Sequence, residues 1–141
     1  MSDLFQGLIQ ALTLIFNLDP DLYSISGRSL QVTLSATIIA SLIGIPFGSW
    51  LAISMFRYRS LVIVIINALM GLPPVVVGLI VYVFLSKSGP FGVFNLLFTP
   101  TAMIIAQVLI ILPIVASVSH RTIRMLWMEY RGFFVSLNAS R

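Results

Sequence analysis

The sequence of 141 residues contains no cysteine and few charged residues. Without cysteine, disulfides, thiolate metal sites and cysteine nucleophiles are excluded. Charged side chains make up 9% of the chain, 59% of the residues are hydrophobic, and the mean hydropathy is +1.08. Soluble domains carry about 25% charged residues. A soluble chain of this length, once folded, still exposes about 30% of the surface of its unfolded chain, so it cannot hide so much apolar surface from water. The composition therefore indicates a membrane protein.

Residues for soluble-enzyme chemistry are also scarce. The sequence has no phosphate-binding G-x-x-x-x-G-K-[ST] motif, so we expect the chain itself to hydrolyse no ATP. One histidine and one glutamate are too few for a metal site or a catalytic triad. The histidine, His120, follows the last apolar stretch and is expected to be an interfacial side chain rather than a proton relay. We therefore expect that the chain is not an enzyme and binds no cofactor or metal. We also expect no nucleic-acid partner, because a net charge of +4 in a membrane protein reports its topology.

Charged residues divide the chain into apolar stretches. Three runs contain none: residues 29–56, 60–86 and 88–119. About 20 apolar residues cross a bilayer core, so each of the first two runs fits one span. The third opens on the turn sequence Ser88-Gly89-Pro90, and Thr99-Pro100-Thr101 is typical of a helix start with proline at its first position. We expect an all-α polytopic membrane helix bundle with three spans, at about 29–56, 61–86 and 100–119.

The N-terminal segment, residues 1–28, is predicted to lie on the membrane surface. Four polar side chains recur at helical spacing on one face: Gln6, Gln10, Thr13 and Asn17. A helix over residues 4–18 is about 22 Å long, which is shorter than the ~30 Å hydrocarbon core. A signal peptide is the alternative, but Asp3 stands where a basic region is expected. We expect Asp19-Pro20-Asp21 to end this helix.

The distribution of Lys and Arg predicts the orientation. One side of the predicted spans carries six basic residues: Arg57, Arg59, Arg121, Arg124, Arg131 and Arg141. The other side carries only Arg28 and Lys87. By the positive-inside rule the N-terminus lies outside and the C-terminus in the cytoplasm.

Small residues recur every four positions along the first span, at Ala36, Ala40, Gly44, Gly48 and Ala52. In lipid, such stripes let helix backbones approach closely. We expect a helix-packing seam at Ala40, Gly44, Gly48 and Ala52, and we expect leucine at position 44 or 48 to lower self-association.

The centre of the second span carries a proline pair, Pro73-Pro74. Two missing N–H donors would leave the Leu69 and Met70 carbonyls without helical partners. Within a membrane such backbone is tolerated only inside protein or beside a watery cavity, and a helix restarting at Pro74 would direct its N-terminal dipole there. A simple kink in a buried helix is the alternative. The predicted translocation-path residues are Asn67, Gly71, Pro73, Pro74, Val75 and Gly78.

Two strings resemble the membrane permeases of tungstate ABC importers, with molybdate permeases close behind. They are Gly71-Leu72-Pro73-Pro74-Val75-Val76-Val77-Gly78 and Phe98-Thr99-Pro100-Thr101-Ala102-Met103, and the resemblance extends from about Ser29 to Arg141. It implies the methionine/molybdate-type ABC permease fold and an oxyanion path through a bacterial or archaeal cell membrane. It also implies a homodimer, a separate cytoplasmic ATP-binding subunit, and a periplasmic or extracellular oxyanion-binding protein.

The C-terminal segment, residues 120–141, resembles the cytoplasmic coupling loop of that family. Its last residues, Ser136 to Arg141, are similar to the family's Ser-Leu-Gly-Ala-Ser-Arg ending. Gly132-Phe133-Phe134 then replaces Glu-Ala-Ala, and Asn138 replaces a glycine. An amphipathic cytosolic helix is the alternative. The residues expected to contact the ATPase are Phe133, Phe134, Leu137, Asn138 and Arg141.

The family has two further spans after this loop. We therefore expect a truncated permease or one that a second polypeptide completes. The alternatives in function are an inactive fragment, or a small oligomerising membrane pore or interaction subunit that uses no ATPase.

Overall fold

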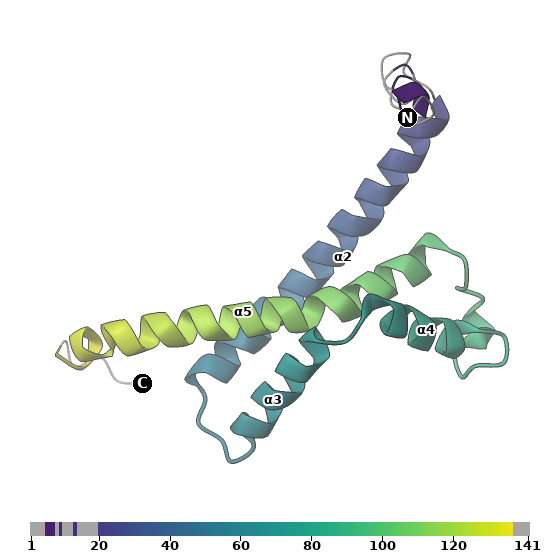
Figure 1. Ribbon diagram of the computed structural model, residues 1–141. Helices are drawn as coiled ribbons and strands as arrows, with labels where there is room; N and C mark the ends of the chain where they lie inside the picture. Colours follow the sequence, from purple (N-terminus) through teal and green to yellow (C-terminus); the bar gives the residue numbers. More distant parts are fainter. Residues whose placement is uncertain (1–4, 8, 10–12, 14–19, 137–141) are drawn as a thin grey trace.

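The computed structural model describes residues 5–7, 9, 13 and 20–136, with side chains up to residue 132. From residue 20 onward it consists of helices: α2 (Pro20–Ile53), α3 (Arg59–Met70), α4 (Pro74–Leu85), the short 3-10 helix η1 (Gly92–Phe94) and α5 (Pro100–Ser136). The described residues include no strand. The two long helices, α2 and α5, cross each other, and α3 and α4 lie on one side of them (Figure 1). The predicted all-α class is confirmed. The predicted surface helix, residues 4–18, falls mostly outside the described residues.

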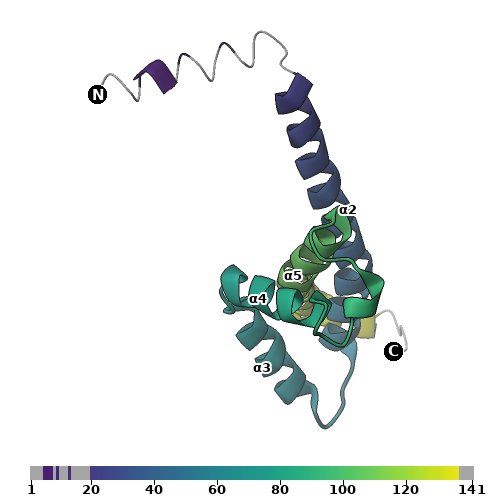
Figure 2. The same ribbon diagram turned by 90° about the vertical axis from the view of Figure 1, so that its right-hand side faces the viewer.

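Helix α2 begins at Pro20, earlier than the span boundary near residue 29 that the charge pattern suggested. Proline is favoured at the first helical position because its missing N–H would be unpaired there anyway, and Asp21 in the first turn favours the positive end of the helix dipole. The expected end of the preceding helix, at Asp19-Pro20-Asp21, is not tested, because residues 14–19 lie outside the described part of the chain. The 34 residues of α2 are about 51 Å long, more than the hydrocarbon core requires. The first turns of α2 extend beyond the other helices (Figures 1 and 2).

The second predicted span is broken at the proline pair. Helix α3 ends at Met70, α4 begins at Pro74, and their axes differ by 97°. Each has 12 residues, about 18 Å, so neither crosses a membrane alone. The carbonyl of Leu69 was expected to lack a partner, but the chain tightens into a turn in which the Leu72 N–H donates to it at 3.2 Å. The Met70 carbonyl keeps no helical donor, because the two residues that would supply one are both prolines.

Helix α5 starts at Pro100, as the sequence pattern predicted, and then continues without a break to Ser136. It therefore runs past residue 119, where the apolar stretch ends, and into the basic segment. The Thr99 hydroxyl before it donates to the Leu96 carbonyl at 2.6 Å. In the described part of the chain, α2 and α5 are long and apolar enough to span a membrane, and α3 with α4 is a third span if the bent pair counts as one.

The main packing contact joins α2 to α5. The small-residue stripe of α2 forms it, and Ala36 and Ala40 are fully buried there. A Cβ atom on Gly44 would lie 3.0 Å from Val115 Cγ1 of α5, so a larger residue at position 44 would require Val115 to shift. The sequence predicted a seam that acts in self-association, whereas in the structure α5 of the same chain covers the stripe.

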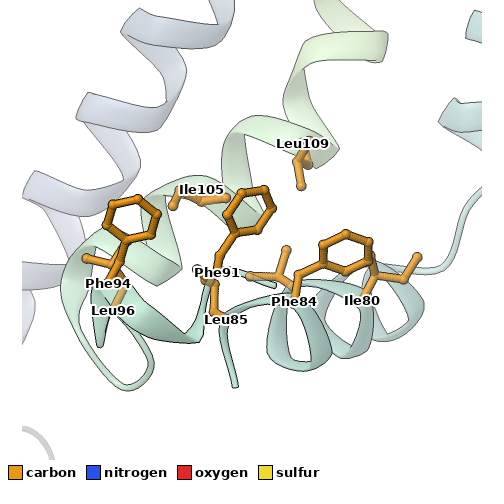
Figure 3. A pocket seen from close by; sticks show the side chains of 9 residues that line it. Ile80, Phe84, Leu85, Phe91, Phe94, Leu96, Ile105 and Leu109 are labelled. Carbon is orange, nitrogen blue, oxygen red and sulfur yellow. The ribbon is translucent and has the colours of Figure 1, made fainter. Parts of the chain in front are cut away.

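An apolar cavity of about 500 Å³ separates α4, the loop before α5, and α5. Figure 3 shows Ile80 and Phe84 of α4 and Ile105 and Leu109 of α5 around it. The Phe84 and Phe91 rings stack with centroids 6.2 Å apart and hold the loop against α4. Because its lining is wholly apolar, this cavity offers no group that would recognise a polar solute.

Candidate functional site

The break between α3 and α4 exposes polar backbone. Pro73 has the extended conformation (ψ 134°), and its carbonyl accepts the N–H groups of Val76 at 2.9 Å and Val77 at 3.4 Å. The Val75 N–H has no acceptor within the turn, and its side chain is 82% exposed. The N-terminal end of α4 therefore presents the free Val75 N–H donor together with the positive end of the helix dipole.

The predicted path residues do not form one cluster within the chain. Gly71, Pro73, Pro74, Val75 and Gly78 are exposed around the break. A Cβ on Gly78 would meet nothing within 4 Å. A path wall would look like this before its opposite wall is supplied, but within this chain the assignment stays a prediction.

Asn67, the remaining path residue, instead joins α3 to α5. Its Oδ1 accepts hydrogen bonds from Ser117 Oγ at 3.1 Å and from Arg121 Nη2 at 3.2 Å. Ser117 is only 4% exposed. Sequence reasoning missed both partners, although Ser117 and Arg121 lie four residues apart and so share a helix face.

A second polar contact joins the start of α3 to α2 and α5. The guanidinium of Arg59 donates to the carbonyls of Leu51 at 2.9 Å and Ala52 at 3.2 Å, and so satisfies the last turn of α2. Its Nη2 also lies 3.4 Å from Nε2 of His120, which is 8% exposed. Because an arginine can only donate, Nε2 is the acceptor, which assigns the ring proton to Nδ1. The histidine is thus held at a three-helix junction.

Two cavities with polar walls lie at opposite ends of the α2–α5 pair. The first has about 500 Å³ and is lined by Phe56, Arg57, Arg59, Ser60, Ile63, His120 and Arg124. The second has about 350 Å³ and includes Arg28, Ser29, Thr33 and Gln107, whose buried Oε1 has no hydrogen-bond partner in the described part of the chain. Sequence reasoning missed both cavities because each one joins residues from distant segments.

The predicted ATPase-contact residues lie at the end of the described chain. Phe133 and Phe134 lie in α5, where the structure describes their backbone but not their side chains. Leu137, Asn138 and Arg141 lie outside the described residues. The coupling role of these five residues therefore stays a prediction.

Among the described residues, no group of three or more His, Asp or Glu side chains could hold a metal ion.

These features define a polytopic α-helical membrane protein with one span broken at a proline pair. Comparison with known proteins identifies the class more closely. The chain is 40% identical over 120 residues to a tungstate uptake system permease protein, TupB, of Peptoclostridium acidaminophilum, which covers 85% of this chain and 53% of that protein. It is 44% identical over 98 residues to a probable anion ABC transporter permease protein of Haloferax volcanii, which covers 70% of this chain and 42% of that protein.

A third relative, TupB of Campylobacter jejuni, is 37% identical over 112 residues, which is 79% of this chain and 47% of that protein. No family model and no solved structure matches. The chain spans about half the length of the curated relatives that it matches. It is homologous to anion ABC transporter permeases, and the resemblance found in its sequence is confirmed.

Proposed function

We propose that the chain is a permease subunit, or part of one, of an ATP-driven oxyanion importer, with tungstate as the first candidate substrate. Two of the three relatives described above are named as tungstate uptake permeases and the third as an anion permease. The structural observation that carries the proposal is the 97° break at Pro73–Pro74. A span interrupted in this way can line a substrate path, because its free backbone groups need polar company.

In the proposed mechanism, the chain supplies path and coupling elements and performs no chemistry itself. A homodimer would enclose the path, an oxyanion-binding protein outside the membrane would deliver the ion, and a separate cytoplasmic subunit would bind and hydrolyse ATP. The N-terminus would lie outside and the C-terminus in the cytoplasm of a bacterium or archaeon.

Backbone groups rather than charged side chains would meet the ion at the break. The Val75 N–H and the N-terminal dipole of α4 can each stabilise an anion weakly. Weak contacts suit conduction, since an ion that binds tightly leaves slowly. Selection among oxyanions would then rest largely with the delivering protein.

The test is uptake in cells that lack their own tungstate and molybdate permeases. The chain is expressed with its binding protein and ATPase, and cellular tungsten is measured with wild type, with the Pro73→Ala/Pro74→Ala double variant, and with Pro90→Ala as a loop control. We expect wild type and the control to accumulate tungsten and the double variant to lose most of it. Failure of wild type to accumulate any oxyanion, together with failure to retain the ATPase on purification, would overturn the proposal.

An oligomerising pore subunit without an ATPase was the alternative from sequence. That alternative depended on the small-residue stripe of α2 as a seam between chains. Because α5 covers the stripe within the chain, the structure provides no free seam of that kind among the described residues.

A further inference from the structure

The basic cavity between the α2–α3 loop and α5 has a wall suited to an anion. Three guanidinium groups line it, from Arg57, Arg59 and Arg124, with the Ser60 hydroxyl beside them. Guanidinium groups present planar forks of donors that match phosphate oxygens. The volume of about 500 Å³ leaves room for such a group.

No acidic side chain lines this cavity in the described part of the chain. The chain contains four acidic residues, of which the structure describes two, Asp21 and Glu129. Neither of these two residues lines the cavity. Like charges gathered around one cavity repel, and a bound anion would remove that cost.

One of the three arginines is held in place before any ligand arrives. Arg59 is fixed by the Leu51 and Ala52 carbonyls and by His120, so its charge stays at the cavity. Arg57 and Arg124 are exposed and make no hydrogen bond within the described residues. Both side chains can turn toward a ligand, because they are exposed.

The position of the cavity along the expected spans indicates the source of the anion. The first charge-free stretch ends at Phe56 and the third at Ser119, so the cavity lies where two apolar helices leave the membrane core. Phe56 also forms part of its wall. Lipid phosphates lie at this level, with acyl chains running beside the apolar helices, and basic pockets between spanning helices bind anionic headgroups.

We propose that this cavity binds a phosphate group, supplied by the headgroup of an anionic lipid. A free tetrahedral oxyanion shares the same chemistry and is the other source. The proposal requires only that the chain is in a membrane, so it stands apart from the transport function proposed above.

The experiment titrates the purified full chain with phosphatidylglycerol and, separately, with phosphatidylcholine or inorganic phosphate, and measures bound lipid by native mass spectrometry and the melting temperature. Arg57→Gln and Arg124→Gln are compared with Arg131→Gln, which removes the same charge from α5 about two turns beyond the cavity. Arg131 lies about 10 Å beyond Arg124 along the helix axis, at the limit of electrostatic screening at moderate salt.

We expect wild type to bind phosphatidylglycerol more tightly than phosphatidylcholine. A basic side chain near the surface contributes about 1 kcal/mol to anionic lipid binding, so each cavity variant should bind about fivefold more weakly, whereas Arg131→Gln should change binding by less than about twofold. Equal effects in all three variants, or no preference for phosphatidylglycerol, would overturn the proposal. If inorganic phosphate stabilises wild type through Arg57 and Arg124 while phosphatidylglycerol adds nothing, the lipid source is wrong.

Discussion

Gly48 of α2 lies so close to the carbonyl oxygen of Ala116 in α5 that a Cβ atom on Gly48 would collide with that oxygen. The same added Cβ atom would lie 2.9 Å from the Cβ of Ser119. Neither neighbour can yield easily, because one is helix backbone and the other is joined directly to it. This point therefore sets how closely the two long helices approach.

Gly48→Leu should separate α2 from α5 and destabilise the fold. Overpacking of a tight contact costs about 1–3 kcal/mol, and the backbone contact puts this site at the upper end. The measurement is thermal or denaturant unfolding of the purified protein in detergent. Gly27→Leu is the matched control on the same helix, since a Cβ at Gly27 would meet nothing within 4 Å. A Gly48→Leu protein as stable as the control would show that the helices do not pack in this way.

The packing seam was predictable from sequence, but its partner was not. The four-residue spacing of Ala36 to Ala52 identifies a face for close helix contact whatever the contacting helix is. The partner face of α5, at Val115 and Ala116, has no comparable repeat of glycines, so nothing in the sequence marks it. Only the three-dimensional arrangement shows that the contact lies within the chain.

The broken span was predictable because proline removes a backbone donor wherever it occurs. The pair Pro73-Pro74 therefore fixed where α3 and α4 separate. The size of the bend, 97°, depends on how α3 and α4 each pack on α5, and no local rule gives it. The Arg59–His120 and Asn67–Ser117 contacts were unpredictable for the same reason, since each joins residues more than 45 positions apart.

The exposure of the break can be tested with single cysteines, because the chain has none of its own. Val75→Cys should react with a charged, membrane-impermeant thiol reagent if the break faces a watery path, since Val75 is 82% exposed. Val77→Cys is the control two residues away, because Val77 is 8% exposed and should stay unreacted. The assay is labelling in native membranes with and without the ATPase and binding protein. Protection of position 75 in both conditions would favour a buried kink over a path.

The Asn67–Ser117 hydrogen bond should couple α3 to α5 energetically. Interhelical hydrogen bonds in membrane proteins contribute about 0.6 kcal/mol on average, with a maximum near 1.7. A double-mutant cycle with Asn67→Ala and Ser117→Ala should therefore give a coupling energy of about that size, measured as unfolding free energies in detergent. The control cycle pairs Asn67→Ala with Thr37→Ala, whose hydroxyl bonds only to Thr33 of its own helix. That cycle should be additive, and additivity in both cycles would contradict the proposed link between the helices.

The C-terminal segment from Tyr130 to Arg141 is expected to dock on the ATPase through its apolar residues. Phe133, Phe134 and Leu137 recur at helical spacing, and a helix with such a face binds a hydrophobic groove of a partner. Buried aromatic anchors cost about 2 kcal/mol or more on truncation, about thirtyfold in affinity, so Phe134→Ala should release the ATPase in a pull-down from detergent. Glu129→Ala is the control on the exposed side of the same helix and should retain it. If both variants retain the ATPase equally, Phe134 makes no anchoring contact and the docking assignment is wrong.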